Sequence, residues 1–256
     1  MLTIILAGGY GTRLAEETRT VPKPMVEVGG RPLLWHIMKL YARHGGREFA
    51  VALGYKGEVI KRYFLDYRMV RGDCAVDLSS GEVTRSGTLD EDWLVHLVDT
   101  GQDTQTGGRL RRLRDLVDGK TFMLTYGDGV SDVDIAALQA FHAAQGKLAT
   151  LTAVRPPARY GSLVLEDGRV SRFSEKDPAS ESWVNGGFFV MEPEVLDMIE
   201  GDATELEKGL LTTLSEQGQL GAYRHDGFWQ SMDTLRDKML LNRLWDGGAP
   251  PWRTWE

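Results

Sequence analysis

Hydrophobic positions in the first half of the chain alternate between two periods. Short continuous apolar runs, typical of buried strands, are separated by segments whose apolar residues recur three or four positions apart, as on one face of a helix. Leu34, Ile37 and Tyr41 follow the helical spacing until Gly45 ends that segment. Such alternation predicts a parallel sheet covered by helices on both faces. The predicted strands are residues 2–6, 48–53, 93–99, 122–126 and 149–154, and the predicted helices are residues 31–44, 56–67, 108–117 and 133–145.

The pattern changes after Pro156 and Pro157, where short strands follow one another without intervening helices. We therefore expect a single domain with two parts. The first, mostly parallel, covers about residues 1–155, and the second, smaller and mixed or antiparallel, covers about residues 156–256. In the second part we predict strands at 162–166, 169–173, 184–191 and 221–223 and helices at 193–199, 205–217 and 233–245.

A polar stretch at residues 71–88 interrupts the first part. It contains Gly72, Gly81 and Gly87 and lacks a core pattern. We interpret it as an inserted excursion, with a small hairpin and a plain surface loop as the alternatives. Its weak core pattern makes it a candidate for mobile or intersubunit structure.

Composition narrows the class of protein. The 256 residues are 42% hydrophobic and 26% charged, and the net charge is −7. This is ordinary for a globular protein and lacks the basic surface of a sequence-independent nucleic-acid binder. Cys74 is the single cysteine, so no intrachain disulfide can form. No apolar run approaches the ~18 residues of a membrane span, and no secretory signal precedes the first strand. We therefore expect a cytoplasmic protein without nucleic-acid or membrane partners.

The first predicted strand runs directly into a glycine-rich turn with the sequence L-A-G-G-Y-G-T-R-L. Such a turn before a helix predicts a phosphate cradle, because its free N–H groups can face an anion at close range. Arg13 adds a forked cation and Lys23 a second one, which together favour a triphosphate. Leu14 stands where a dinucleotide fingerprint needs its third glycine, and no lysine follows as in a Walker loop. A plain tight turn is the alternative. The residues of the predicted cradle are Leu6, Ala7, Gly8, Gly9, Gly11, Thr12, Arg13 and Lys23.

Two aspartates are candidate metal ligands. Asp128 follows an apolar strand in a glycine turn, at the edge where parallel sheets bind ligands. Its carboxylate suits Mg²⁺, and a turn stabilised by the aspartate is the alternative. Asp233 precedes the last predicted helix, where the alternative is a helix N-cap.

These motifs resemble those of the sugar-1-phosphate nucleotidylyltransferases. The turn matches the family's L-A-G-G-x-G-T-R-L segment, and P-K-P-M at residues 22–25 matches its K-P-K-P or K-P-M segment. The similarity runs nearly end to end and favours the glucose-1-phosphate cytidylyltransferase branch. The other matching segments are residues 35–39, 54–57, 99–101, 106–110, 126–129, 184–189, 227–234 and 251–256.

The resemblance implies a Rossmann-like, mostly parallel sheet of the nucleotide-diphospho-sugar transferase fold. The first part would bind the nucleotide and the second the sugar phosphate. The implied reaction transfers a cytidylyl group from CTP to α-D-glucose 1-phosphate and gives CDP-glucose and pyrophosphate. Mg²⁺ is the implied cofactor, CTP and a sugar 1-phosphate are the implied partners, and a homo-oligomer is expected, hexameric in the cytidylyl branch.

The resemblance also implies roles for individual residues. Arg13 and Lys23 would contact the triphosphate and act in catalysis, while Asp128 and Asp233 would hold the metal. The T-G-G-R segment would face cytosine, which is the main reason for expecting CTP. The nucleotide-binding set adds Thr106, Gly107, Gly108, Arg109, Gly127 and Asp128 to the cradle, and the sugar-phosphate set is Tyr126, Gly161, Glu175, Lys176, Asn185 and Gly186.

Three features depart from the family pattern. Asp177 follows Lys176 where the family has proline, the loop at residues 179–183 differs, and Ser231 replaces another proline. These departures leave open another sugar 1-phosphate, or another pyrimidine nucleotide such as dTTP or UTP. A metal-dependent glycosyltransferase and a non-catalytic nucleotide-sugar sensor are the alternatives of a different class.

Overall fold

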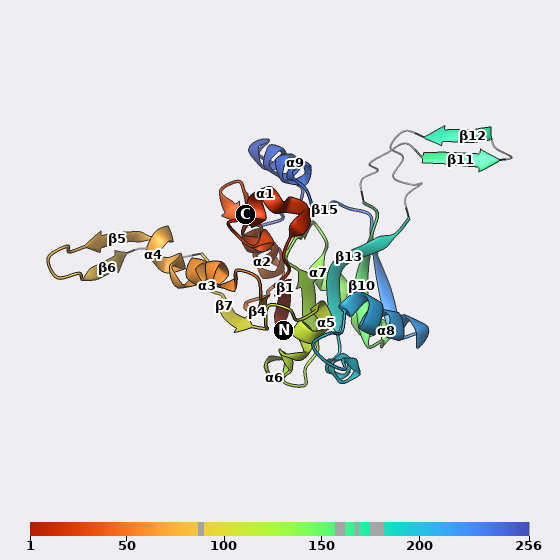
Figure 1. Cartoon of the computed structure of the whole chain (residues 1–256), viewed down its shortest axis with the longest axis horizontal. Coiled ribbons are helices and arrows are strands. Elements are labelled where there is room, and N and C mark those ends of the chain that lie inside the picture. The colour runs from red at the N-terminus through yellow and green to blue at the C-terminus, as the bar shows by residue number, and fades with distance from the viewer. Residues whose placement is uncertain (87–89, 157–161, 167–168, 175–181, 256) are drawn as a thin grey trace.

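A seven-stranded sheet forms the centre of the molecule (Figure 1). The computed structural model describes residues 1–86, 90–156, 162–166, 169–174 and 182–255. The strand order is β14-β10-β13-β8-β1-β4-β7, and neighbours are parallel except that β13 runs antiparallel to β10 and β8. The predicted mostly parallel α/β sheet is confirmed. Its strands are β1 (Thr3–Ala7), β4 (Glu48–Leu53), β7 (Leu94–Asp99), β8 (Phe122–Tyr126), β10 (Ala149–Val154), β13 (Val184–Met191) and β14 (Leu220–His225).

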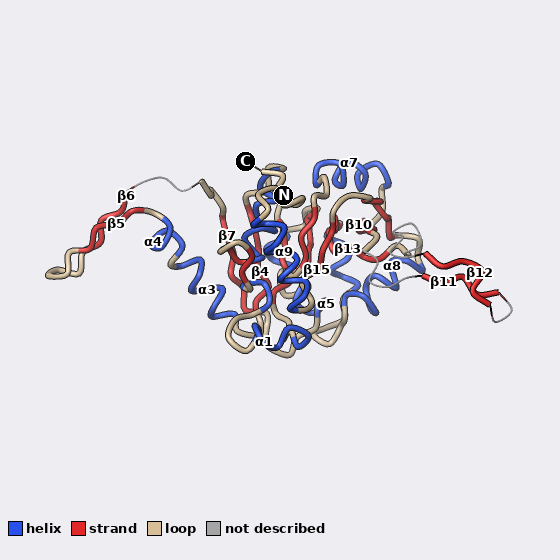
Figure 2. Tube along the Cα trace, turned by 90° about the horizontal axis from the view of Figure 1, so that it is seen from above, coloured by secondary structure: helices blue, strands red, loops and turns tan. Residues whose placement is uncertain are grey.

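Helices cover both faces of the sheet (Figure 2). Because successive side chains of a strand point to opposite faces, Ile4 and Ile5 of β1 enter different cores, as do Phe188 and Phe189 of β13. The core that contains Ile5 lies under three helices, α2 (Leu33–Arg43), α7 (Ile135–Gln145) and α9 (Leu235–Asp246). The core that contains Ile4 lies on the opposite face. Its covering elements are α5 (Thr106–Arg111), α6 (Arg114–Val117), the 3₁₀ turn η4 (Pro193–Met198), the π-helical turn η5 (Leu206–Leu211) and α8 (Thr212–Glu216).

The helix predicted at residues 108–117 is divided into α5 and α6. Leu113 leaves helical geometry, with φ −98° and ψ 8°, and α6 begins at the next residue. Leu110 and Leu113 both remain buried in the core on this face. Among the described residues, no helix is both long and apolar enough to cross a bilayer.

The excursion predicted at residues 71–88 contains a hairpin. The helix predicted before it is α3 (Gly57–Leu65) followed by α4 (Tyr67–Arg71). β5 (Asp73–Val76) then pairs with β6 (Val83–Ser86) in antiparallel register. Figures 1 and 2 show this hairpin projecting from the edge of the sheet that carries β7.

The second part of the chain is less separate than predicted. β11 (Ser162–Glu166) and β12 (Arg169–Ser174) form their own antiparallel ribbon, but β13 and β14 join the central sheet. β14 is parallel to β10, not antiparallel. β13 and β14 run in opposite directions on the two sides of β10, and the segment through η4, η5 and α8 connects the end of β13 to the start of β14 at the same end of the sheet.

Candidate active site

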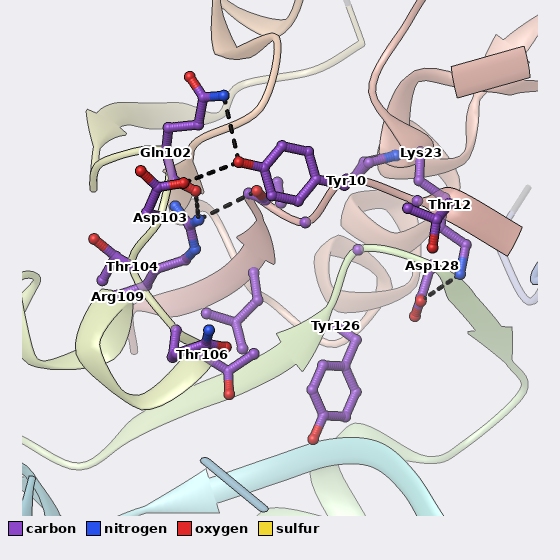
Figure 3. A pocket seen from close by; sticks show the side chains of 18 of the residues that line it. Tyr10, Thr12, Lys23, Gln102, Asp103, Thr104, Thr106, Arg109, Tyr126 and Asp128 are labelled. Carbon is purple, nitrogen blue, oxygen red and sulfur yellow. Dashed lines mark hydrogen bonds and ion pairs between the residues drawn. The ribbon is translucent and has the colours of Figure 1, made fainter. Parts of the chain in front are cut away.

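A cavity of about 480 Å³ opens at the carboxyl ends of β1 and β8 (Figure 3). This is the edge at which parallel α/β sheets bind ligands. The glycine-rich turn forms one wall, and the segment at residues 102–106 forms another. The predicted site residues that line the cavity are Leu6, Ala7, Gly8, Gly9, Gly11, Thr12, Arg13, Lys23, Thr106, Arg109, Tyr126, Gly127 and Asp128.

Pairing between two short strands brings the predicted carboxylates together. β9 (Gly129–Ser131) begins directly after Asp128, and β15 (Trp229–Ser231) ends two residues before Asp233. The two strands pair antiparallel, and the Met232 N–H donates to the Asp128 carbonyl oxygen at 2.8 Å. Both aspartates therefore stand at the same end of one two-stranded ribbon.

The ammonium group of Lys23 lies between these carboxylates. Its Nζ is 2.7 Å from Oδ2 of Asp128 and 2.8 Å from Oδ1 of Asp233. Burial alone would lower the pKa of Lys23, but the charges and hydrogen bonds of both aspartates raise it above its ordinary value. Burial would raise the pKa of Asp233, but Lys23, Arg13 and Ser231 hold it below its ordinary value. Lys23 and Asp233 are therefore both charged at neutral pH.

The alternative role of Asp233 as a helix N-cap is not what the structure shows. Thr234 caps α9: its hydroxyl accepts from the Asp237 N–H, and the Asp237 carboxylate accepts from the Thr234 N–H in return. Ser231 Oγ donates to Oδ2 of Asp233 at 3.1 Å. The serine that departs from the family pattern thus contacts a predicted metal ligand.

Asp128 and Asp233 form a pair of hard oxygen donors that fits a divalent cation. The two carboxylates already converge on one positive charge, the Lys23 ammonium. Mg²⁺ is usually held by one or two carboxylates, with phosphate oxygens and water completing its shell. Within the described ranges, no group of three or more acidic, histidine or cysteine side chains could hold a metal. The two aspartates are therefore the candidate ligands, and substrate phosphates would supply the rest.

Arg13 stands at the outer edge of the cavity. Its Nη1 is 3.4 Å from Oδ1 of Asp233, and 77% of the side chain is exposed. Gly11, with φ +64°, turns the chain into the 3₁₀ turn Thr12–Leu14 that carries Arg13. Glycine adopts this left-handed conformation without strain. The turn thus places an exposed guanidinium beside the ion-paired group of Lys23, Asp128 and Asp233.

The guanidinium of Arg109 is buried beneath the glycine turn. Nη1 donates to the carbonyl oxygens of Leu53 and Gly101 at 2.9 and 2.6 Å, and Nη2 to those of Gly8 and Gln102 at 3.2 and 3.0 Å. A Cβ at Gly8 would lie 2.3 Å from this guanidinium, so only glycine fits there. Arg109, expected to contact the base, lines the cavity and also joins the end of β4 to the glycine turn and the loop after β7, which form two of the cavity walls.

Gly107 and Gly108 do not line the cavity, unlike the other predicted nucleotide-binding residues. A Cβ at Gly107 would lie 2.7 Å from the Thr204 carbonyl oxygen, and one at Gly108 would lie 2.6 Å from Cα of Asp202. These glycines therefore allow α5 to pack against residues 202–204. We expected these glycines to permit a close approach to the base, whereas in the structure they permit close packing of α5.

A series of hydrogen bonds connects Asn185, predicted to bind the sugar, with Thr106, predicted to bind the nucleotide. Asn185 Nδ2 donates to the Tyr126 hydroxyl at 3.3 Å, and that hydroxyl donates to Oε1 of Glu207 at 2.6 Å. The Thr106 hydroxyl donates to Oε2 of the same carboxylate at 3.2 Å. Burial and the Glu207 charge raise the pKa of Tyr126, which keeps its hydroxyl a donor. No motif pointed to Glu207, which lies on η5.

Other predicted residues lie away from the cavity or outside the described residues. A Cβ at Gly186 would lie 2.7 Å from Cγ1 of Val154, so this glycine allows close packing against β10. Gly161, Glu175 and Lys176, predicted on the sugar-phosphate side, fall outside the described residues.

Other residues that line the cavity were missed, namely Tyr10, Pro24, Gln102, Asp103, Thr104 and Gln105. The Tyr10 hydroxyl donates to Oδ1 of Asp103 at 3.0 Å and accepts from Gln102 Nε2 at 3.3 Å (Figure 3). Tyr10 stands inside the glycine turn, and Gln102 follows the D-T-G segment at residues 99–101, so both lay next to recognised motifs.

The chain has a mostly parallel α/β fold with a cavity at the carboxyl ends of its central strands, and solved structures share this fold. A putative glucose-1-phosphate thymidylyltransferase from Bacillus anthracis has a TM-score of 0.67 at 18% identity, with 95% of each chain covered. A UDP-glucose pyrophosphorylase complexed with UDP-glucose has a TM-score of 0.68 at 15% identity, covering 96% of this chain and 98% of that one.

The nucleotidyl transferase family model matches residues 2–234, and the chain belongs to that family. The predicted family is thereby confirmed. The chain is 51% identical over 257 residues to the glucose-1-phosphate cytidylyltransferase of Salmonella typhi, with all of both proteins covered. It is 42% identical over 256 residues, again with full coverage of both, to a probable glucose-1-phosphate cytidylyltransferase of Bacillus subtilis (strain 168).

Proposed function

We propose that the protein transfers a cytidylyl group from CTP to α-D-glucose 1-phosphate, giving CDP-glucose and pyrophosphate. The observation that carries this proposal is the convergence of Lys23, Asp128 and Asp233 beside the glycine turn. The full-length similarity to glucose-1-phosphate cytidylyltransferases supports the choice of both substrates.

The reaction needs charge neutralisation more than proton transfer. An oxygen of the sugar phosphate attacks the α-phosphorus of CTP and forms a new P–O bond, while the bond to the oxygen bridging the β-phosphate breaks. Pyrophosphate leaves with that electron pair. Because the attacking oxygen is already anionic, no general base is required, and the main obstacle is repulsion between two polyanions. Lys23 and Arg13 are placed to reduce it.

Mg²⁺ is the proposed cofactor, with Asp128 and Asp233 as its protein ligands. When bound, it would neutralise charge on the phosphate oxygens. Lys23 holds the two carboxylates in register, and Ser231 fixes the orientation of the Asp233 carboxylate. Gly9 allows the turn to approach phosphate groups, since a Cβ there would point into open space with nothing within 4 Å.

On the sugar side, we propose that Asn185 contacts the sugar hydroxyls and Lys176 binds the phosphate, with Tyr126 and Glu175 in the same site. The hydroxyl of Tyr126 is held by Asn185 and Glu207. The division into a nucleotide-binding part over residues 1–155 and a sugar-phosphate-binding part over residues 156–256 stays a prediction, as do the homo-oligomeric state and the cytoplasmic location.

Pyrophosphate release tests the proposed activity. We would measure it with Mg²⁺ across CTP, dTTP, UTP, ATP and GTP, each combined with several sugar 1-phosphates. One dominant response, for CTP with glucose 1-phosphate, is expected. A dominant response with another sugar would retain the chemistry and change the acceptor. No pyrophosphate release, together with release of a nucleoside diphosphate from a nucleotide sugar when an acceptor is present, would instead indicate a glycosyltransferase.

Substitution of Asp128 by Asn tests the site itself. We expect Asp128→Asn to lower kcat/KM by at least about a hundredfold, because a charge that orders the cations around the phosphates is lost with little change in volume. The matched control is Asp226→Asn, an exposed aspartate outside the cavity. Near wild-type activity in Asp128→Asn, with unchanged circular dichroism, would contradict the assigned role.

A further inference from the structure

A second cavity, of about 380 Å³, lies where α2, α4 and the C-terminal tail meet. It shares no lining residue with the active-site cavity. Its volume falls in the range of small-molecule sites, which begins at ~300 Å³. Nothing in the proposed reaction uses it.

The lining of this second cavity is cationic, although the chain as a whole is acidic. Arg31, Lys39, Arg71 and Arg253 are opposed by only two carboxylates, which leaves two positive charges in excess. One of these carboxylates, that of Glu91, is already 3.7 Å from the Lys39 ammonium. Among the described residues, the three arginines have no carboxylate partner. A local excess of this kind attracts anions whatever the net charge of the chain.

Arg31 carries the clearest unmet hydrogen-bond donor. Its Nη1 is buried and has no hydrogen-bond partner within the described residues. The buried hydroxyl of Tyr63 lies beside Arg31 and Arg71: burial raises the pKa of Tyr63, and the charges and hydrogen bonds of these two arginines oppose that shift. Buried polar groups are nearly always paired, so the buried Nη1 of Arg31 at this cavity is a donor that a ligand oxygen could satisfy.

Aromatic rings hold the arginines in position. The guanidinium of Arg31 lies 4.9 Å from the centre of the Trp35 ring, and that of Arg253 lies 5.5 Å from the centre of the Trp245 ring. Cation–π contacts of this kind fix the plane of the guanidinium before a ligand arrives. Fixed, forked donors match the geometry of phosphate oxygens better than flexible ammonium groups do.

We propose that this second cavity binds the phosphate groups of a small phosphorylated molecule of nucleotide size. Its three arginines, which have no carboxylate partner among the described residues, would contact the phosphate oxygens, and its volume leaves room for more than one phosphate. This inference does not depend on the proposed transferase activity, because it rests on residues that the active site does not contain.

Equilibrium dialysis of the full chain counts the sites. We would use phosphate-free buffer and three labelled probes, namely inorganic pyrophosphate, CTP and CDP-glucose, and determine molecules bound per chain. Two sites per chain are expected for at least one probe, since the active site supplies one. The probe that fills both sites shows whether the phosphate comes from an inorganic anion, a nucleotide or a nucleotide sugar.

Variants assign the second site. Arg31→Gln and Arg71→Gln should each remove it and leave one site per chain, whereas Arg68→Gln should retain both. Arg68 is the matched control, because it is an exposed arginine on the same helix as Arg71 but outside the cavity. Arg71 is itself exposed, so its variant keeps the test valid if Arg31→Gln fails to fold.

Two results would overturn the proposal. One is a single site per chain with all three probes, including the case in which a second copy of the chain covers the cavity. The other is a second site that survives in both glutamine variants. Neither result would affect the assignment of the catalytic cavity, which the pyrophosphate-release assay tests separately.

Discussion

Arg109 shows how one side chain can connect several segments around a site. Its guanidinium lines the cavity and donates to four carbonyl oxygens, at the end of β4, in the glycine turn and in the loop after β7. The arginine is 4% exposed, and Gly8 and Gly54 leave room for it on either side. Arg109 therefore acts as a positioning residue for the cavity walls.

Replacement of Arg109 by lysine tests this role. Lysine has three donors on one atom and cannot reach all of these carbonyls, so buried acceptors would be left unpaired. We expect Arg109→Lys to lower the free energy of unfolding by ~1–3 kcal/mol and to raise the KM for CTP. Urea unfolding and steady-state kinetics would measure the two effects.

The control for this experiment is Arg111→Lys on the same helix. Arg111 is exposed and donates to one carbonyl, that of Glu200. Its variant should stay within about 0.5 kcal/mol of the wild type. Equal unfolding free energies and equal KM values for the two lysine variants would show that the carbonyl groups around Arg109 do not need its guanidinium. That result would refute the positioning role.

At the scale of elements, the turn between β2 and β3 packs closely against α9. β2 (Glu27–Val28) and β3 (Arg31–Pro32) are joined by Gly29 and Gly30, which have φ values of +58° and +71°. A Cβ at Gly29 would lie 2.1 Å from Nε1 of Trp245 on α9, whereas a Cβ at Gly30 would meet nothing within 4 Å. The two glycines therefore share a backbone constraint but differ in packing.

That difference predicts unequal effects of alanine. Gly29→Ala and Gly30→Ala should both lose ~1–2 kcal/mol of unfolding free energy to the left-handed backbone. Gly29→Ala should lose a further ~1–3 kcal/mol, because Trp245 must move. Urea unfolding of both variants gives the comparison, and equal losses would show that α9 shifts freely away from the turn.

At the scale of the whole molecule, His36 ties the C-terminal tail to the core. It is fully buried; Nε2 lies 2.9 Å from the Val28 carbonyl oxygen, and Trp252 Nε1 donates to Nδ1 at 3.4 Å. The rings of Trp245 and Trp255 also pack against it. This network assigns the proton of the neutral ring to Nε2. Burial lowers the pKa of His36 to about 4.

A depressed histidine pKa makes stability depend on pH in a defined direction. The unfolded chain binds a proton at His36 below about pH 6.5, whereas the folded chain resists protonation until about pH 4. The stability contributed by the neutral ring is therefore present above pH 6.5 and falls as the pH drops toward 4, by up to about 3 kcal/mol.

Urea unfolding between pH 7 and pH 4 would measure this dependence. His36→Gln, which cannot titrate, should be less stable at pH 7 but should lose less stability on acidification than the wild type. His96→Gln is the control, since His96 is partly exposed on β7 and pairs with Glu48. An acid response in His36→Gln as steep as in the wild type would rule out His36 as its source.

The amino-acid sequence by itself determined the features that depend on neighbouring residues. Apolar periodicity predicted β4, β8 and β10 with their observed bounds, and the glycine spacing predicted the turn that lines the active-site cavity. The order of its motifs also identified the family, which the family model confirms. Strand and turn preferences act over a few residues, and sequence patterns carry them directly.

Only the tertiary structure decided how distant segments meet. Lys23 contacts carboxylates 105 and 210 positions away, because the β9–β15 ribbon sets both beside the glycine turn. The position of β14 beside β10, the contacts of Arg109 with several segments, and the second, cationic cavity arise in the same way. A side chain's partners are set by sheet order and by which helices cover each face, and no local pattern specifies these contacts.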